Sequence, residues 1–201
     1  MKIIQNNNLD EIITALENGA VLVCPTDTVY GLVCDATNER AVEKIFEIKG
    51  RDKNKPLPVF VKDLEMAKEL AEISDEPAFA KGSGVARQEE TIKKSWPGAT
   101  TFILKAKEQK LSPLVYKDGT VALRAPNYGL IREIFKKFAK PLAQTSANVS
   151  GMPATTKIKE IVSQLENQKV QPDFVIDTGD LAENNPSAII DLTANNKIIR
   201  K

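Results

Sequence analysis

Amphipathic helical segments alternate with short runs of apolar and β-branched residues along the whole of this 201-residue chain. Apolar residues at helical spacing predict helices over the segments 9–16, 39–49, 64–73, 128–139 and 158–166. Short apolar runs bounded by turn residues predict strands over the segments 20–24, 58–61, 101–105, 120–124, 142–145, 174–177, 188–192 and 197–199. Because some predicted strands follow one another directly, we expect an α/β (α+β) fold around a mixed sheet, not a strictly parallel one.

The predicted helix boundaries carry recognisable signals. Asn8 precedes the first helix with Glu11 three residues after it, and Gly50 follows the second helix, as capping residues do. The segment 74–88 contains Pro77 and several small residues, so any helix there is expected to be interrupted. No internal repeat, low-complexity tract or linker divides the chain, which predicts a single domain over residues 1–201.

The composition excludes several classes of chemistry. The chain has no histidine, which removes histidine-based catalytic triads and metal sites built on imidazole. Its two cysteines, Cys24 and Cys34, are too few for a four-thiolate zinc site or an iron–sulfur cluster, and we expect buried thiols in a reducing cytoplasm. Lysine and arginine number 28 against 27 acidic residues, so the net charge of +1 makes no general case for nucleic-acid or membrane binding. No apolar run is long enough for a membrane span or a signal peptide.

Polar residues cluster after the predicted strands, where open α/β sheets usually bind ligands. The segment 25–31 (Pro-Thr-Asp-Thr-Val-Tyr-Gly) presents three hydroxyl groups, a carboxylate and a turn glycine directly after the strand 20–24. These residue types could hold a polar ligand, but they equally suit an Asx or ST turn that closes a strand. The spacing alone leaves both interpretations open.

A cluster of cations lies between the helix 39–49 and the strand 58–61. It contains Lys49, Arg51, Lys53 and Lys55, four positive charges against one anion, on a turn with a glycine. Guanidinium and ammonium groups in this arrangement are suited to gripping a polyphosphate. The alternative is a solvated surface loop, which is the usual role of an isolated charge run.

Phosphate contacts in this chain would have to come from side chains and isolated amides. There is no P-loop motif, and the glycines at 82 and 84 lack both the final glycine of a dinucleotide fingerprint and a preceding strand. The segment 145–151 (Thr-Ser-Ala-Asn-Val-Ser-Gly) offers hydroxyl and amide groups at a strand end, although it could also be a helix N-cap. Arg124 and Ser187 lie at two further strand ends, and a single strand arginine is often a surface ion pair.

In this order along the chain, these segments resemble the motifs of the YrdC/TsaC family, the threonylcarbamoyl-AMP synthases. The resemblance rests on the segments 25–32 (PTDTVYGL), 49–51 (KGR), 96–98 (WPG), 124–126 (RAP) and 146–151 (SANVSG). It extends to 187–191 (SAIID) and Arg200, and so covers nearly the whole chain.

The resemblance implies a YrdC-like twisted mixed β-sheet flanked by helices, with a concave, positively charged face that holds the active site. It implies an L-threonylcarbamoyladenylate synthase, a nucleotidyltransferase that condenses L-threonine, bicarbonate and ATP, with Mg²⁺ on the ATP, and releases pyrophosphate. The product would supply the t6A37 modification of tRNA through a downstream threonylcarbamoyl transferase complex. Some members also bind tRNA or double-stranded RNA, and no membrane partner is expected.

The resemblance also assigns site residues. It places L-threonine contacts at Thr28, Tyr30, Arg124 and Ser187. It places ATP contacts at Lys49, Arg51, Lys55, Thr120, Ser146, Asn148 and Arg200. Lys49 and Arg51 are the expected catalytic residues, since positive charge must stabilise phosphoryl transfer, and no metal-ligating residue is expected. Phe60 stands where some archaeal and long-form relatives have a histidine, and the chain stops at Lys201 as a short-form member would.

Two alternatives stay open at the level of sequence. Carbamoyl-adenylating enzymes of the hydrogenase-maturation type contain a related domain, but within long chains whose acylphosphatase and zinc-finger modules do not fit 201 residues and two cysteines. A module for binding tRNA or double-stranded RNA could use the cations of 49–55. Affinity for a phosphate backbone increases with the number of cations that contact it. Because the net charge of this chain is near zero, RNA binding is the less favoured main function.

Overall fold

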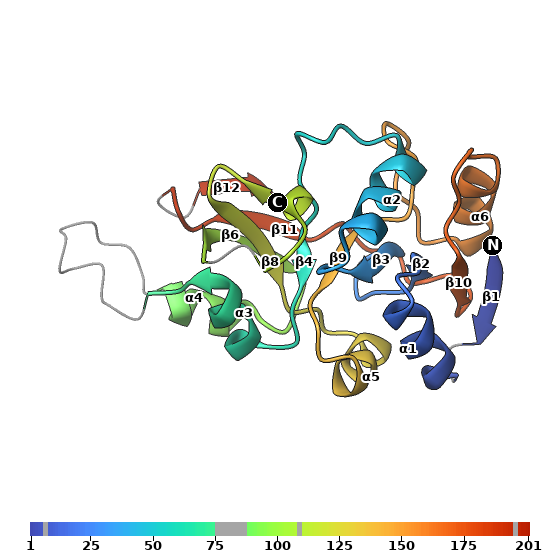
Figure 1. Cartoon of the computed structure of the whole chain (residues 1–201). Coiled ribbons are helices and arrows are strands. Elements are labelled where there is room, and N and C mark those ends of the chain that lie inside the picture. The colour runs from blue at the N-terminus through green and yellow to red at the C-terminus, as the bar shows by residue number, and fades with distance from the viewer. Residues whose placement is uncertain (6–7, 75–87, 108–109, 195–196) are drawn as a thin grey trace.

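One mixed β-sheet runs through the protein and carries helices on both of its faces (Figure 1). The computed structural model describes residues 1–5, 8–74, 88–107, 110–194 and 197–201. Within these residues the helices are α1 (Leu9–Glu17), α2 (Glu39–Lys49), α3 (Leu64–Leu70), α4 (Gln88–Ser95), α5 (Gly129–Lys137) and α6 (Ile158–Glu166), with a 3₁₀ turn at Pro113–Val115. The strands are β1 (Lys2–Gln5), β2 (Leu22–Cys24), β3 (Gly31–Asp35), β4 (Val59–Phe60), β5 (Ala71–Glu72), β6 (Thr100–Ala106), β7 (Tyr116–Lys117), β8 (Thr120–Arg124), β9 (Leu142–Ser146), β10 (Phe174–Asp177), β11 (Ala188–Asp191) and β12 (Lys197–Arg200).

The sheet combines parallel and antiparallel pairs. Its strands lie in the order β1-β10-β2-β3-β9-β4-β8-β6-β11-β12, while β5 pairs with β6 and β7 pairs with β8. Strands β1, β10 and β2 are parallel, as are β4 with β8 and β6 with β11. The pairs β2–β3, β3–β9, β4–β9, β6–β8 and β11–β12 are antiparallel. The mixed sheet expected from the sequence is therefore confirmed.

The two faces of the sheet are buried under different helices. Successive residues of β2 point to opposite faces, so Val23 packs in one apolar cluster while Leu22 and Cys24 pack in the other. Apolar residues of α2 and α6 belong to the first cluster, and those of α1 and α5 to the second (Figure 1). The thiols of Cys24 and Cys34 are buried in this core, as expected, and burial raises the pKa of both.

The capping signals at the start of α1 and the end of α2 are confirmed. The Asn8 side chain accepts a hydrogen bond from the Glu11 amide at 3.3 Å. Gly50 ends α2 in the left-handed conformation, with φ at 58°, which glycine adopts without steric cost. This change of direction separates Lys49, the last residue of the helix, from Arg51, the first residue of the following loop.

Other boundaries differ from the prediction. The helix expected over 64–73 ends at Leu70, because Ala71 and Glu72 become extended and pair as β5 with β6. Pairing within the sheet here overrides the local helical pattern. Strands β1, β3 and β7 and helix α4 have no counterpart among the predicted elements. Of the segment 74–88, where any helix is expected to be interrupted, residues 75–87 lie outside the described residues.

Candidate functional site

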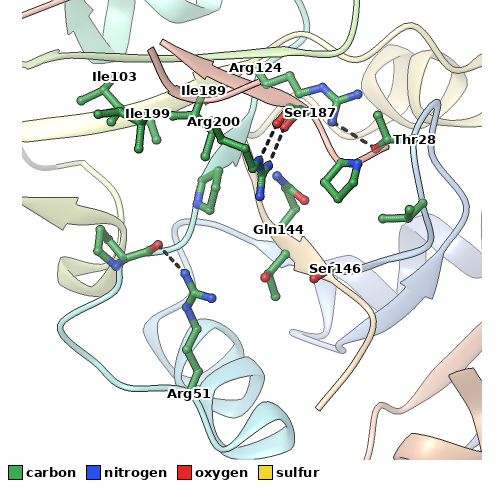
Figure 2. A pocket seen from close by; sticks show the side chains of 16 residues that line it. Thr28, Arg51, Ile103, Arg124, Gln144, Ser146, Ser187, Ile189, Ile199 and Arg200 are labelled. Atoms are coloured by element: carbon green, nitrogen blue, oxygen red, sulfur yellow. Dashed lines mark hydrogen bonds between the residues drawn. The ribbon is translucent and has the colours of Figure 1, made fainter. Parts of the chain in front are cut away.

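A cavity of about 300 Å³ lies over one face of the sheet and reaches the ends of several strands (Figure 2). Strands β6, β8, β9, β11 and β12 contribute to its wall, together with the loops that precede β3 and β4. The lining residues are Thr28, Val29, Arg51, Pro56, Pro58, Ile103, Ala122, Arg124, Gln144, Thr145, Ser146, Pro186, Ser187, Ile189, Ile199 and Arg200. A cavity of this size suits a small-molecule ligand.

The structure brings one part of the predicted site together and leaves another part outside the cavity. The predicted residues that line it are Thr28, Arg51, Arg124, Ser146, Ser187 and Arg200. The predicted residues that do not line it are Tyr30, Lys49, Lys55, Thr120 and Asn148. Gln144 lines the cavity but was not predicted, although its position two residues before Ser146 on one strand puts both side chains on the same face.

The cavity has an apolar part and a cationic part (Figure 2). The side chains of Ile103, Ile189 and Ile199 gather in the apolar part, from strands β6, β11 and β12. The guanidinium-bearing residues that line the cavity are Arg51, Arg124 and Arg200. Among the described lining residues there is no carboxylate. The arrangement therefore suits an anionic ligand that also carries an apolar portion.

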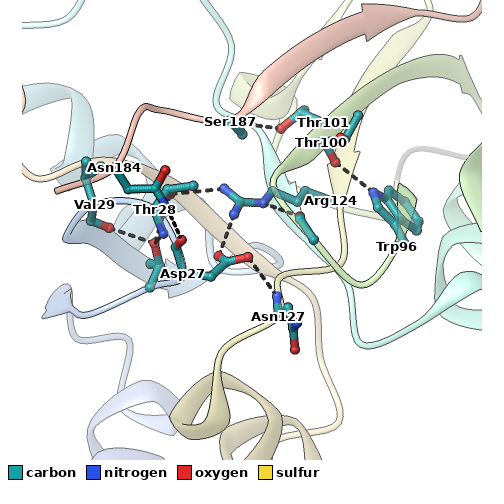
Figure 3. Close-up of polar contacts among 12 residues, drawn as sticks. Asp27, Thr28, Val29, Trp96, Thr100, Thr101, Arg124, Asn127, Asn184 and Ser187 are labelled. Atoms are coloured by element: carbon teal, nitrogen blue, oxygen red, sulfur yellow. Dashed lines mark hydrogen bonds and ion pairs between the residues drawn. The ribbon is translucent and has the colours of Figure 1, made fainter. Parts of the chain in front are cut away.

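Arg124, at the end of β8, is the most buried of these cations, with 2% of its surface exposed. Its Nε donates to the Gly98 carbonyl oxygen at 3.0 Å, its Nη1 to Thr28 Oγ1 at 3.3 Å, and its Nη2 to Asp27 Oδ1 at 2.5 Å (Figure 3). The guanidinium carbon lies 5.5 Å from the centre of the Phe60 ring. Burial lowers the pKa of Arg124 and the Asp27 carboxylate opposes that shift. A guanidinium has five N–H groups, so these contacts leave two for a ligand.

Asp27 is a site residue that the sequence did not single out. Its second carboxylate oxygen accepts a hydrogen bond from the Asn127 amide at 2.9 Å, so it joins the segment 25–31 to the loop after β8 (Figure 3). The sequence signal that could have indicated Asp27 is its carboxylate within the hydroxyl-rich segment 25–31, together with Arg124 at the end of another strand. No local rule pairs Asp27 with Arg124, because they are 97 positions apart in the chain.

The Trp-Pro-Gly turn after α4 supports Arg124 from the side away from Asp27. A Cβ atom at Gly98 would lie 2.7 Å from the Ser95 carbonyl oxygen, so only glycine fits where the Arg124 Nε finds its acceptor. The indole Nε1 of Trp96 donates to the Thr100 carbonyl oxygen at 2.7 Å, which ties the turn to the start of β6 (Figure 3). The role of this motif is thus to position the arginine.

The segment 25–31 is both a turn and a part of the cavity. Thr26 Oγ1 donates to the Val29 carbonyl oxygen at 2.7 Å and accepts from the Thr28 amide at 3.1 Å, as in an ST turn. The same turn holds Thr28 Oγ1 within 3.3 Å of the Arg124 guanidinium. The two interpretations that the sequence left open are therefore compatible.

Lys49 lies behind the cavity wall and holds the end of β9. It is 2% exposed, and its ammonium group donates to the Ser146 carbonyl oxygen at 2.6 Å, the Asn148 carbonyl oxygen at 2.6 Å and Asn148 Oδ1 at 2.9 Å. Ser146 Oγ also donates to Asn148 Oδ1, at 2.6 Å. Lys49 and Asn148 therefore position Ser146, which does line the cavity.

Replacing Lys49 by methionine should remove a pH-dependent part of the protein's stability. Burial, with a smaller effect from Arg51, lowers the pKa of Lys49 from 10.5 to about 7 in the folded protein. Between these values the unfolded chain binds more protons at this site, so the free energy of unfolding should rise with pH, by about 1.4 kcal/mol per pH unit. Urea unfolding at about pH 7.5, 8.5 and 9.5 should show that rise in the wild type and a flatter line in the variant. If the free energy of unfolding changed equally with pH in the wild type and the variant, the lowered pKa of Lys49 would be contradicted.

Arg51 folds the loop after α2 around its own side chain. Its Nε donates to the Lys55 carbonyl oxygen at 2.8 Å. Its Nη2 donates to the Pro56 carbonyl oxygen at 3.3 Å, which is the hydrogen bond drawn from Arg51 in Figure 2. Burial lowers the pKa of Arg51. Lys55 thus contributes a backbone carbonyl to the loop, while its own side chain is exposed and does not line the cavity.

Two other predicted contacts lie away from the cavity. The hydroxyl group of the fully buried Tyr30 donates to the Gly179 carbonyl oxygen at 2.7 Å and accepts from the Thr178 amide at 3.1 Å. It therefore joins the start of β3 to the loop after β10. Thr120 Oγ1 donates to the Lys117 carbonyl oxygen at 2.7 Å, at the start of β8 and beyond the lining residues.

Arg200 is held at the cavity by the residue that precedes β11. Its Nε donates to the Ser187 carbonyl oxygen at 2.8 Å and its Nη2 to Ser187 Oγ at 3.3 Å (Figure 2). Burial lowers the pKa of Arg200. These hydrogen bonds join Arg200, which the sequence predicts to contact ATP, directly to Ser187, which the sequence predicts to contact the substrate threonine.

Two negative observations apply to the part of the chain that the structure describes. None of its helices there is long and apolar enough to cross a membrane. Nor do three or more histidine, cysteine, aspartate or glutamate residues gather anywhere in the described ranges in a way that could hold a metal ion.

Comparison with known proteins identifies the family. A model of the Sua5/YciO/YrdC family, described as "Telomere recombination", matches residues 14–201. The chain belongs to the Sua5/YciO/YrdC family. The resemblance inferred from the ordered motifs is thereby confirmed.

Relatives of this Sua5/YciO/YrdC protein include enzymes with an assigned reaction. The putative threonylcarbamoyl-AMP synthase of Methanocaldococcus jannaschii is 38% identical over 173 residues, which are 86% of this chain and 74% of the relative. The threonylcarbamoyl-AMP synthase of Bacillus subtilis is 36% identical over 154 residues, 76% of this chain and 42% of the relative. The crystal structure of P. abyssi Sua5 complexed with L-threonine matches 96% of this chain and 55% of its own, with a TM-score of 0.80 and 28% identity. The chain thus spans about half the length, or less, of two of these relatives.

Proposed function

We propose that this protein is an L-threonylcarbamoyladenylate synthase, a nucleotidyltransferase that condenses L-threonine, bicarbonate and ATP and releases pyrophosphate. The observation that carries the proposal is the cavity, where Arg51, Arg124 and Arg200 meet beside an apolar wall. Relatives named threonylcarbamoyl-AMP synthase, and the structural likeness to a Sua5 protein complexed with L-threonine, support it.

The proposed reaction depends on positioning and positive charge. Bicarbonate supplies carbon dioxide as its C–OH bond breaks, and the neutral amine of threonine bonds to the carbon of that carbon dioxide. The amine loses a proton, which leaves with the hydroxide as water, and a carbamate is formed. A carbamate oxygen then bonds to the α-phosphorus of ATP while the bond from that phosphorus to pyrophosphate breaks. Several anionic groups must come together, and fixed cations stabilise the charge on the phosphoryl oxygens in the transition state. A chain without histidine can supply this chemistry.

We assign each part of the substrates to a side of the cavity by its charge and polarity. The two free N–H groups of Arg124 would hold the threonine carboxylate, with the hydroxyl groups of Thr28 and Ser187 close by. Arg51 and Arg200 would face the phosphates, together with Ser146, whose position Lys49 and Asn148 maintain. The nucleobase would lie against the isoleucine side chains of the apolar part.

Mg²⁺ would enter this cavity with ATP, on the oxygens of the polyphosphate. The described lining residues include no carboxylate, and the nearby Asp27 is already paired with Arg124, so the donor set does not fit a resident metal ion. When bound, the ion would neutralise charge on the departing pyrophosphate. The product would supply t6A37 modification of tRNA through a threonylcarbamoyl transferase complex, in the cytoplasm.

The main alternative functions make different demands. A module for double-stranded RNA needs an extended basic surface that spans grooves, whereas the arginines here line a cavity of about 300 Å³. Carbamoyl adenylation would need carbamoyl phosphate in place of threonine and bicarbonate.

Pyrophosphate release from ATP and Mg²⁺ separates these functions. We expect release that requires both threonine and bicarbonate and that carbamoyl phosphate does not support. Release driven by carbamoyl phosphate alone would favour the carbamoyl-adenylating reaction. An absence of release, combined with RNA binding that weakens steeply with salt, would favour the RNA-binding module.

A further inference from the structure

A buried hydroxyl group lies beside the cavity, on the same face of β6 as Ile103, and contacts a residue that lines the cavity. Thr101 of β6 is 1% exposed, and its Oγ1 lies 3.0 Å from Ser187 Oγ (Figure 3). Ser187 Oγ in turn accepts a hydrogen bond from Arg200 Nη2 at 3.3 Å (Figure 2). Ser187 and Arg200 line the cavity, whereas Thr101 does not. The three side chains thus form a short chain of hydrogen bonds from the sheet interior to the cavity.

The donors and acceptors in this chain determine what Ser187 can offer a ligand. A guanidinium only donates, so Ser187 Oγ is the acceptor for Arg200. Between the two hydroxyl groups, either can be the donor. If Thr101 donates, Ser187 accepts twice and keeps its own proton for the cavity. If Ser187 donates to Thr101, no hydroxyl proton remains for a ligand.

An anionic ligand selects between these two arrangements. A hydroxyl group that donates to a charged acceptor forms a stronger hydrogen bond than one that donates to a neutral hydroxyl. Donation from Thr101 and from Arg200 also polarises the Ser187 hydroxyl group, which strengthens its own donation. With an anion in the cavity, the arrangement in which Thr101 donates is therefore favoured.

We propose that Thr101 is a positioning residue that directs the Ser187 hydroxyl proton into the cavity, toward the carboxylate of the amino-acid substrate. The proposal rests on the proposed function, in which Ser187 contacts threonine and Arg200 contacts ATP. Because one oxygen atom accepts from Arg200 and donates to the amino acid, binding of either substrate favours the geometry that the other requires. Thr101 therefore contributes to threonine affinity and to the coupling between the two substrates.

A pair of substitutions at Thr101 tests this role. Thr101→Val keeps the β-branched shape of the side chain but removes the hydroxyl group, whereas Thr101→Ser keeps the hydroxyl group. We expect Thr101→Val to raise the KM for threonine roughly fivefold, because the Ser187 hydroxyl group loses the neutral hydrogen bond that fixes and polarises it. The KM for ATP should change less. Thr101→Ser should recover most of the threonine affinity. An unchanged threonine KM in Thr101→Val, or an equal defect in both variants, would overturn the proposal.

A crystal structure without substrates separates failure of this inference from failure of the proposed function. In Thr101→Val we expect Ser187 Oγ to leave its contact with Arg200 Nη2, because the serine loses its partner on β6. Retention of that contact in the variant would overturn the positioning role. If the wild type releases no pyrophosphate with threonine and bicarbonate, the proposed function fails, and the crystal structures still decide whether Thr101 positions Ser187.

Discussion

Replacing Arg124 by alanine should abolish threonine-dependent pyrophosphate release and lower the free energy of unfolding by about 3–5 kcal/mol. The loss of stability follows because Asp27, only 12% exposed, would keep a negative charge without its partner. The loss of activity follows because the guanidinium of Arg124 is the group we assign to the threonine carboxylate. Urea unfolding and a pyrophosphate assay on the same preparation measure the two effects.

A double variant distinguishes the two effects of Arg124. Replacing both members of a buried ion pair by apolar residues often restores stability, because no unpaired charge remains. The combination Asp27→Leu and Arg124→Met should therefore recover much of the stability that Arg124→Ala loses, yet remain inactive with threonine. Near-normal threonine-dependent activity in the double variant would show that the pair serves the fold alone.

Replacing Arg51 by alanine should reduce threonine-dependent pyrophosphate release at least a hundredfold while the protein stays folded. The backbone carbonyls of Lys55 and Pro56 hold this guanidinium at the cavity. Removing one such charged contact typically costs on the order of 3–4 kcal/mol of transition-state stabilisation, which corresponds to a loss of at least a hundredfold. Steady-state kinetics with each substrate varied, together with a thermal unfolding curve, measures the effect.

Lys53 provides the matched control for Arg51. It lies two residues further along the same loop, carries the same charge, and pairs with Glu43 at 2.5 Å on the exposed surface without lining the cavity. Lys53→Ala should retain activity within about twofold, since exposed ion pairs contribute little. A similar loss in both variants would mean that net positive charge, not the position of Arg51, accounts for the effect.

Local patterns were sufficient to predict much of the fold. Helices α2 and α6 and strands β8 and β10 have the predicted bounds, because their apolar spacing coincides with clear boundary residues. The prediction was wrong after Leu70, where pairing with β6 overrides helical spacing. Strands β1 and β3 went unpredicted although they are as long as β10 and β8, so strand length does not explain the difference.

The sequence was sufficient to predict which site residues lie near strand ends, but not which of these residues contact one another. Thr28, Arg124 and Ser187 line the cavity because each lies beside a strand end, and strand ends can be located from local sequence. The contact of Asp27 with Arg124 depends on sheet order, in which β9 and β4 lie between β3 and β8, and sequence spacing does not encode that order.

The surroundings of Lys49 could not be predicted for a different reason. Lys49 and Arg51 belong to one cation cluster in the sequence, yet the left-handed Gly50 sends Lys49 to the end of β9 and Arg51 to the cavity. A charge cluster gives the number of cations, whereas the backbone at a single glycine decides which of them reaches a ligand.

The proposed function is the joining of threonine, bicarbonate and ATP. The most direct measurement is incubation with ATP, Mg²⁺, L-threonine and isotopically labelled bicarbonate, followed by mass spectrometry of the products. The proposed function predicts threonylcarbamoyl-AMP that carries the label in its carbamoyl carbon, formed together with pyrophosphate and absent when threonine is omitted. Hydrolysis of ATP without a labelled adenylate, or no reaction from folded protein, would contradict it.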